Sequence, residues 1–117
     1  TTSVIIWQSN TNLIKISTLY AQSEPEDIIP EKFSLYQNYP NPFNPYTEIG
    51  FDLPSPCNVK LEIFNIMGQK VATLIDKNLE AGHHTLQWDA SNQASGVYFY
   101  KITAGDIVET KKMVLLK

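Results

Sequence analysis

Apolar and polar residues alternate in several short runs along this chain, and this alternation restricts the fold more than any other feature. Every second residue is apolar from Ile49 to Leu53 and again from Val59 to Ile63. A period of two places one face of a β-strand against a core. Turn-forming clusters at residues 67–69, 79–82 and 104–106 separate further β-prone runs at roughly 8–12-residue spacing. We therefore predict an all-β sandwich of about seven antiparallel strands, with no helical segment.

Three prolines close together interrupt the alternation just before the first of these runs. Pro40, Pro42 and Pro45 fall within six residues, which excludes a helix and a central strand. Each proline also pushes the residue before it toward extended geometry. We expect a stiff, ordered loop here, anchored in the core by the side chain of Phe43.

The composition divides the chain into three parts. Residues 1–22 carry two β-prone stretches around a turn-like cluster, and they predict an N-terminal β-hairpin or strand extension. Residues 23–32 are acidic, contain proline and show no periodicity, which is typical of a linker. Residues 33–117 form the expected folded domain. Because two strands alone are marginally stable in water, we expect the N-terminal hairpin to pack on another chain or on an upstream domain.

Charge and hydropathy exclude two classes of interaction. The chain has nine basic residues, all of them Lys, twelve acidic residues and a net charge of −3. Bidentate recognition of phosphate or guanine relies mainly on Arg, and a nucleic-acid-binding surface carries an excess of basic residues, so we expect no nucleic acid partner. The sequence contains no run of about 20 apolar residues, so we expect no transmembrane segment.

The residues that most often carry chemistry are few and scattered. His83 and His84 are neighbours in a predicted strand, so their side chains point to opposite faces and cannot readily bind one metal ion. Asp89 and Asn92 share a loop, where an ordinary turn is a better explanation than a calcium site with about six oxygens or more. Cys57 is either a reactive thiol or, as we favour, a small apolar residue at the start of a strand. We expect no enzymatic activity, no metal and no cofactor.

Aromatic side chains offer one further possibility, a platform for sugars. The candidates are Trp7, Tyr36, Tyr39, Tyr46, Trp88, Tyr98 and Tyr100. Most of them occupy alternating strand positions, where packing in a core is the better explanation. We interpret Trp88 as a core residue, followed by a turn that Asp89 caps.

Five motifs, in order along the chain, resemble those of the type A C-terminal sorting domain of the type IX secretion system. They are Asn38–Pro45, Asn65–Val71, Gly82–Asp89, Ala94–Tyr100 and Lys111–Lys117. The resemblance covers residues 33–117 as a whole. The residues that carry the family pattern are Pro40, Asn41, Pro42, Phe43, Asn44, Pro45, Gly68, Gly96 and Tyr98.

The resemblance implies an immunoglobulin-like sandwich that directs a secreted protein across the outer membrane. The implied partners are the outer-membrane secretion machinery and a sortase-like peptidase. The implied location is the cell surface or the medium, reached through the periplasm of a Gram-negative bacterium. The sorting signal is expected at Lys111, Lys112, Met113, Val114, Leu115, Leu116 and Lys117.

We expect the last strand to act as an open sheet edge. An edge strand can pair with a partner through its backbone, which would supply affinity. Residues 113–116 are all apolar, so alternate side chains should face the core. Met113, Val114 and Leu116 would then supply specificity.

Two other functions are compatible with the sequence. A structural subunit of an extracellular filament would use residues 1–22 to pair with copies of itself, as donor strands do. A carbohydrate-binding or adhesive module would need a row of exposed aromatic side chains. Only 32 residues precede the expected domain, and the first residue is Thr rather than Met. We therefore expect either a small secreted protein or part of a longer one.

Overall fold

The computed structural model describes residues 29–117, and in this range it contains β-strands and turns but no helix. The strands are β2 (Ser34–Leu35), β3 (Tyr46–Leu53), β4 (Cys57–Asn65), β5 (Lys70–Leu79), β6 (Gly82–Asp89), β7 (Gly96–Ala104) and β8 (Ile107–Leu115). All paired strands are antiparallel. The prediction of about seven antiparallel strands is therefore confirmed for this part of the chain.

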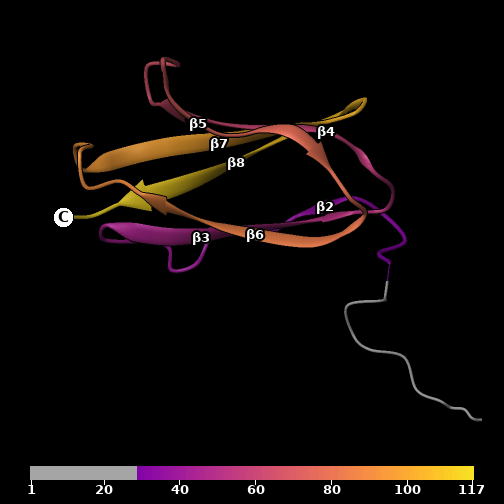
Figure 1. Ribbon diagram of the computed structural model, residues 1–117. Coiled ribbons are helices and arrows are strands. Elements are labelled where there is room, and N and C mark those ends of the chain that lie inside the picture. The colour runs from indigo at the N-terminus through magenta and orange to yellow at the C-terminus, as the bar shows by residue number, and fades with distance from the viewer. Residues whose placement is uncertain (1–28) are drawn as a thin grey trace, which may run out of the picture.

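The strands form two sheets that face each other across a shared core (Figure 1). One sheet has the order β2-β3-β6, and the other has the order β5-β4-β7-β8. In Figure 1 the three-stranded sheet lies below the four-stranded sheet, and the last residues leave at the left-hand end. The predicted β-sandwich is confirmed.

The position of β5 distinguishes this sandwich from the immunoglobulin constant arrangement, in which the fourth strand joins the sheet of the first two. Here a tight turn after Asn65 keeps β5 paired with β4. The two residues between Leu79 and Gly82 then carry the chain across to the other sheet, where β6 pairs with β3. The result is an immunoglobulin-like two-layer fold with β5 moved to the four-stranded sheet.

The core consists of the inward faces of these strands. In β3, Ile49, Phe51 and Leu53 have no exposed surface, and the residues between them are less buried. The same alternation appears along β7. The other buried apolar residues are Leu35, Phe43, Val59, Leu61, Ile63, Trp88, Ala90, Tyr98, Tyr100, Ile102, Ala104, Met113 and Leu115. The alternation that predicted the strands therefore also identified their core-facing sides.

Two predicted parts of the chain fall largely outside the described range. The N-terminal hairpin (residues 1–22) and residues 23–28 of the linker lie outside the described residues. From Ile29 to Phe33 the described chain contains no strand. Within residues 29–117 there is also no helix of a length and hydropathy that would cross a membrane. The domain boundary near residue 32 stays a prediction.

Candidate functional site

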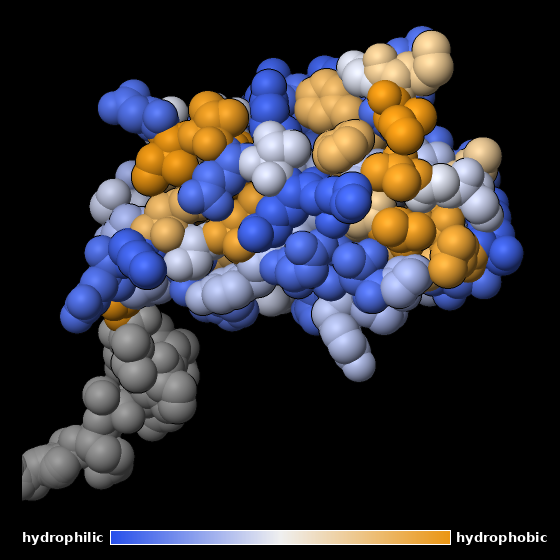
Figure 2. All heavy atoms as spheres, turned by 180° about the vertical axis from the view of Figure 1, so that it is seen from behind, coloured by the Kyte–Doolittle hydropathy of each residue, from blue (hydrophilic) through white to orange (hydrophobic). Residues whose placement is uncertain are grey.

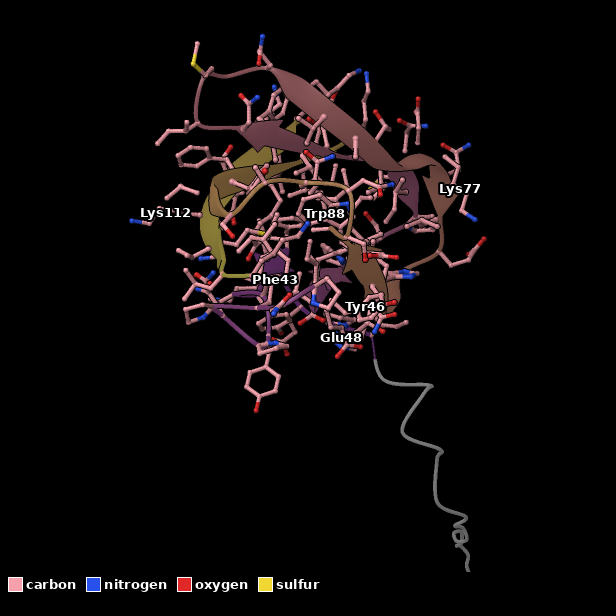
Figure 3. The ribbon with its side chains drawn as sticks, turned by 90° about the vertical axis from the view of Figure 1, so that its left-hand side faces the viewer. Phe43, Tyr46, Glu48, Lys77, Trp88 and Lys112 are labelled. Carbon is pink, nitrogen blue, oxygen red and sulfur yellow. The ribbon has the colours of Figure 1, made fainter. Side chains whose placement is uncertain are left out.

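The proline-rich segment before β3 is an ordered loop with one side chain buried at its centre. Phe43 is 2% exposed, and its ring centroid lies 5.9 Å from that of Trp88 (Figure 3). The residues on either side of it, Pro42 and Asn44, are exposed. We call residues 38–45 the Asn-Pro loop. The prediction that Phe43 anchors this loop in the core is confirmed.

A buried hydrogen-bond network fixes the start of the Asn-Pro loop. The backbone N–H of Asn38 donates to the hydroxyl oxygen of Tyr100 (2.9 Å), and this hydroxyl donates to the carbonyl of Tyr36 (2.7 Å). The side-chain amide of Asn38 donates to Thr47 Oγ1 (2.9 Å) and to the carbonyl of Pro40 (3.1 Å). Burial raises the pKa of Tyr100 to about 12, so the phenol keeps the proton that it donates. The network therefore ties the loop to both sheets.

The C-terminal segment, residues 111–117, alternates between buried and exposed side chains. Met113 and Leu115 have no exposed surface, whereas Lys112 is exposed and Leu116 is 56% exposed. Alternate side chains face the core, as predicted. The expectation that Met113 contacts a partner directly is wrong for the folded domain, because its side chain is enclosed between the sheets.

The outer edge of the C-terminal segment is occupied by the Asn-Pro loop. The N–H of Val114 donates to Asn41 Oδ1 (3.0 Å), and the carbonyl of Val114 accepts from the N–H of Phe43 (3.0 Å). The N–H of Leu116 donates to the carbonyl of Phe43 (3.0 Å). The expectation of an open edge at the end of the last strand is therefore wrong. These backbone groups are paired within the domain and are not available for strand addition.

Further contacts hold the C-terminal segment at both of its ends. Gln37 Nε2 donates to the carbonyl of Lys112 (2.8 Å). The N–H of Lys117 donates to Ser95 Oγ (3.0 Å), and Lys117 Nζ donates to the carbonyl of Ser91 (2.6 Å). The structure thus brings the predicted sorting residues and the Asn-Pro loop together into one surface.

The remaining family-pattern residues shape the backbone and the core. Gly68, in the turn after β4, has a φ of +82°, and Gly96, at the start of β7, has a φ of +153°. Residues with a side chain rarely adopt such angles, which explains glycine at both positions. Tyr98 is buried, with its ring centroid 5.7 Å from that of Trp88 and its hydroxyl donating to the carbonyl of Ala94 (2.7 Å).

The two histidines have different partners on the two sides of β6. His83 Nδ1 lies 2.7 Å from Asp52 Oδ1, whereas the His84 ring stacks on buried Phe51. The rings therefore face opposite ways, as predicted. Burial raises the pKa of Asp52, but hydrogen bonds from Tyr36 and His83 together lower it by more, so that its pKa lies below the usual value.

The other two candidates for chemistry have ordinary structural surroundings. The carboxylate of Asp89 accepts from the side chain and the backbone N–H of Ser91, and these bonds lower its pKa; the backbone bond is 2.9 Å long. This is the turn that we favoured over a calcium site. Cys57 is the first residue of β4 and packs partly buried against the core. Within residues 29–117, the His, Cys, Asp and Glu side chains form no group of three or more that could hold a metal ion.

Some of the aromatic candidates are buried and others are exposed, and the sequence predicted this difference only in part. Trp88, Tyr98 and Tyr100 lie in the core, as we favoured, and Trp7 lies outside the described residues. Three tyrosines are exposed instead, namely Tyr36 (44%), Tyr39 (79%) and Tyr46 (47%). The sequence did contain a signal for Tyr46, because it alternates in phase with the polar residues of its strand and not with the apolar ones.

Comparison with known proteins identifies a family whose pattern covers both the Asn-Pro loop and the C-terminal segment. A family model described as "Secretion system C-terminal sorting domain" matches residues 37–116. This range includes all of the Asn-Pro loop and nearly all of the C-terminal segment. No curated protein sequence matched the chain. Since the matched residues make up more than half of the sequence, the chain belongs to the family of type IX secretion C-terminal sorting domains.

Proposed function

We propose that this domain directs the protein that carries it across the bacterial outer membrane by being recognised, and that it catalyses no reaction. The observation that carries the proposal is the family match over residues 37–116. The partners would be the outer-membrane machinery of type IX secretion and a sortase-like peptidase. The route would pass through the periplasm to the cell surface or the medium.

The recognition surface that we propose lies on the outer face of the four-stranded sheet, beside the C-terminal segment. The strand register places Lys112 opposite Phe99, Phe99 opposite Phe64, and Val114 opposite Val97. The four apolar residues of this set are only partly buried. We call these five residues the C-terminal strip. Figure 2 shows apolar side chains at both ends of the face in view, and the group on the right lies toward this end of the sheet.

The C-terminal strip has the composition of a protein-binding surface. Lys101 Nζ lies 5.6 Å from the ring centroid of Phe64, so a cation borders the apolar centre. Leu116 (56% exposed), Ile66 (69%) and Met67 (79%) add exposed apolar surface at the same end of the domain. Exposed apolar patches with a polar rim are typical of protein interaction sites. Because the backbone edge at Val114 and Leu116 is already paired, recognition through side chains replaces strand addition at this end of β8 in this proposal.

Export of a passenger fused to this domain tests the C-terminal strip. Leu116→Asp introduces a charge beside the strip without touching the core. We expect export to fall about tenfold or more, because a loss of about 1.4 kcal/mol in recognition changes an equilibrium by that factor. The measurement compares passenger in the medium and on the surface with passenger in the periplasm. The matched control is Val108→Asp in β8, since Val108 is 57% exposed but lies far from the strip along the strand.

A substitution distinguishes loss of recognition from loss of folding better than a truncation does. Deletion of residues 112–117 would remove Met113 and Leu115 from the core, so a loss of export would not separate recognition from unfolding. Equal urea midpoints for the two variants and the unmodified domain keep these effects apart. Unchanged export of a folded Leu116→Asp variant would contradict recognition at this end of the sheet face.

A further inference from the structure

Three tyrosines lie on the outward face of the three-stranded sheet. Tyr46 belongs to β3 itself, and Tyr39 pairs with Glu48 of β3 through two backbone hydrogen bonds (3.0 and 2.8 Å). The N–H of Tyr36 donates to the carbonyl of Gly50 (2.9 Å). Positions 46, 48 and 50 follow one another on one face of β3, so the three tyrosines are staggered along about 14 Å of the sheet.

These rings stay outside the core although every other tyrosine in residues 29–117 is buried. Tyr36, Tyr39 and Tyr46 are 44%, 79% and 47% exposed, against 5% for Tyr98 and 0% for Tyr100. Figure 3 shows Tyr46 on the lower sheet, away from the interior where Trp88 lies. Packing in the core therefore does not explain the positions of these three rings.

Polar side chains lie among the rings. A hollow of about 290 Å³ on this face is lined by Tyr39, Pro40, Tyr46, Thr47, Glu48 and Gln87. Glu48 and Gln87 are directly opposite each other in the register of β3 and β6. Further along the face, Asp52 accepts a hydrogen bond from the hydroxyl of Tyr36 and lies 2.7 Å from His83 Nδ1. The face therefore combines aromatic surface with hydrogen-bonding groups at fixed positions.

We propose that this face binds a neutral oligosaccharide or polysaccharide chain. The rings of Tyr39 and Tyr46 offer apolar surfaces on which the C–H face of a sugar ring can stack. Glu48 and Gln87 offer acceptors and a donor for sugar hydroxyl groups. The stagger of the tyrosines along the sheet favours several linked sugar rings over a single one. The site lies on the opposite sheet from the C-terminal strip, so it is independent of the sorting function.

The charge of the face favours a neutral glycan over an anionic one. Strands β2, β3 and β6 contain no lysine. The outward positions of β3 and β6 instead include Glu48, Asp52 and Asp89. A uronic acid or a sulfated sugar would therefore meet a like charge at Glu48, and none of these three strands supplies a lysine to compensate it.

The backbone and the side chains of the face disfavour a peptide ligand. β3 is hydrogen-bonded on both sides, to β2 and to β6, so a peptide cannot be added to it as a strand. The outward residues of β3 and β6 include no Leu, Ile, Val or Met, so the face offers no pocket for aliphatic side chains.

Titration of the isotope-labelled full chain with soluble oligosaccharides, followed by amide NMR shifts, tests the proposal. The probes are the hexamers of β-1,4-glucose, β-1,3-glucose, β-1,4-mannose, β-1,4-xylose and β-1,4-N-acetylglucosamine. We expect at least one to shift the amides of Glu48, Gly50 and Gln87 in a saturable way. Tyr39→Ala and Tyr46→Ala should each raise the Kd about tenfold, whereas Tyr39→Phe should retain binding because it keeps the ring.

Matched controls and two further probes decide the outcome. Val108→Ala shortens a side chain that is 57% exposed, between the values of Tyr46 and Tyr39, but on β8 of the other sheet, and it should leave the Kd unchanged. The proposal is overturned if no hexamer saturates these shifts, or if binding is indifferent to both tyrosine-to-alanine variants. It is equally overturned if only polygalacturonate, as an anionic glycan, or tetramethylammonium, as a cation that aromatic rings can hold, shifts these amides.

Discussion

Among single side chains, Phe43 joins the Asn-Pro loop to the core and to the end of the chain. Its ring packs near Trp88, and its backbone pairs with Val114 and Leu116. We predict that Phe43→Ala lowers the free energy of unfolding by about 3–5 kcal/mol, the usual cost of removing a buried phenylalanine. The measurement is a urea denaturation curve of the full chain.

The neighbouring Asn44→Ala provides the control for this prediction. Asn44 is exposed, so its loss should change the free energy of unfolding by no more than about 0.5 kcal/mol. A loss below about 1 kcal/mol for Phe43→Ala would contradict its role as an anchor.

Asp52 gives the domain a contribution to stability that depends on pH. Its pKa is lower in the folded state than in the unfolded state, because bonds from Tyr36 and His83 outweigh the effect of burial. The contribution is therefore present above the unfolded pKa of about 4 and is lost as the pH falls through the folded pKa. We predict that the melting temperature falls less on acidification in Asp52→Asn than in the unmodified chain.

Two observations would check the assignment to Asp52. Carboxyl carbon NMR should give a pKa for Asp52 below the value of about 4 that is usual for aspartate. Asp106→Asn, which removes a carboxylate from the exposed turn between β7 and β8, is the matched control for this comparison. Identical acid profiles for Asp52→Asn and the unmodified chain would contradict the prediction.

At the level of elements, the outer edge of β8 is hydrogen-bonded to the Asn-Pro loop near the end of the strand but not near its start. Near its end, the amides of Val114 and Leu116 donate to the Asn-Pro loop. Near its start, the outward amides of Val108 and Thr110 have no hydrogen-bond acceptor among residues 29–117. We predict that hydrogen exchange is slow at the first pair and fast at the second, although all four lie along one edge.

A single substitution distinguishes the hydrogen bond of the Val114 amide from that of the Leu116 amide. Asn41→Ala removes the acceptor of the Val114 amide and leaves the acceptor of the Leu116 amide, the Phe43 carbonyl. Exchange should therefore accelerate at Val114 and remain slow at Leu116. Equal protection at Val108 and Val114 in the unmodified chain would show that the whole edge is covered.

The strands were predictable from the sequence because their signal is local. The alternation from Ile49 to Leu53 depends only on neighbouring residues, and so does the turn that requires Gly68. The pairing of the strands was not predictable in the same way. β5 and β6 are separated by only two residues, yet they belong to different sheets. Nothing in those two residues indicates that the chain crosses from one sheet to the other.

The same limit explains the errors in the candidate site. Phe43 and Val114 are 71 positions apart, so no local pattern shows that the Asn-Pro loop covers the end of β8. The resemblance identified both segments but not their contact. The exposed tyrosines form a similar case, because Tyr36 and Tyr46 share a face only through the register of β2, β3 and the residues beside them.

On the scale of the whole molecule, residues 29–117 contain one core to which both sheets contribute. The buried apolar residues of the described chain run from Leu35 to Leu115 and belong to both sheets. We predict that a chain beginning at Ile29 unfolds cooperatively, with a melting temperature close to that of the full chain. A broad, non-cooperative transition would show that the upstream residues belong to the folded unit.

Residues 4–20 then have a separate role to test, namely pairing with another chain or with an upstream domain. Their β-prone sequence predicts strands that are only marginally stable by themselves. If they pair with copies of the chain, the full-length protein should show a mass that rises with concentration in light scattering, whereas the chain beginning at Ile29 should stay monomeric. Both chains should unfold with the same midpoint when diluted. A full-length protein that stays monomeric at every concentration would contradict pairing between copies of the chain.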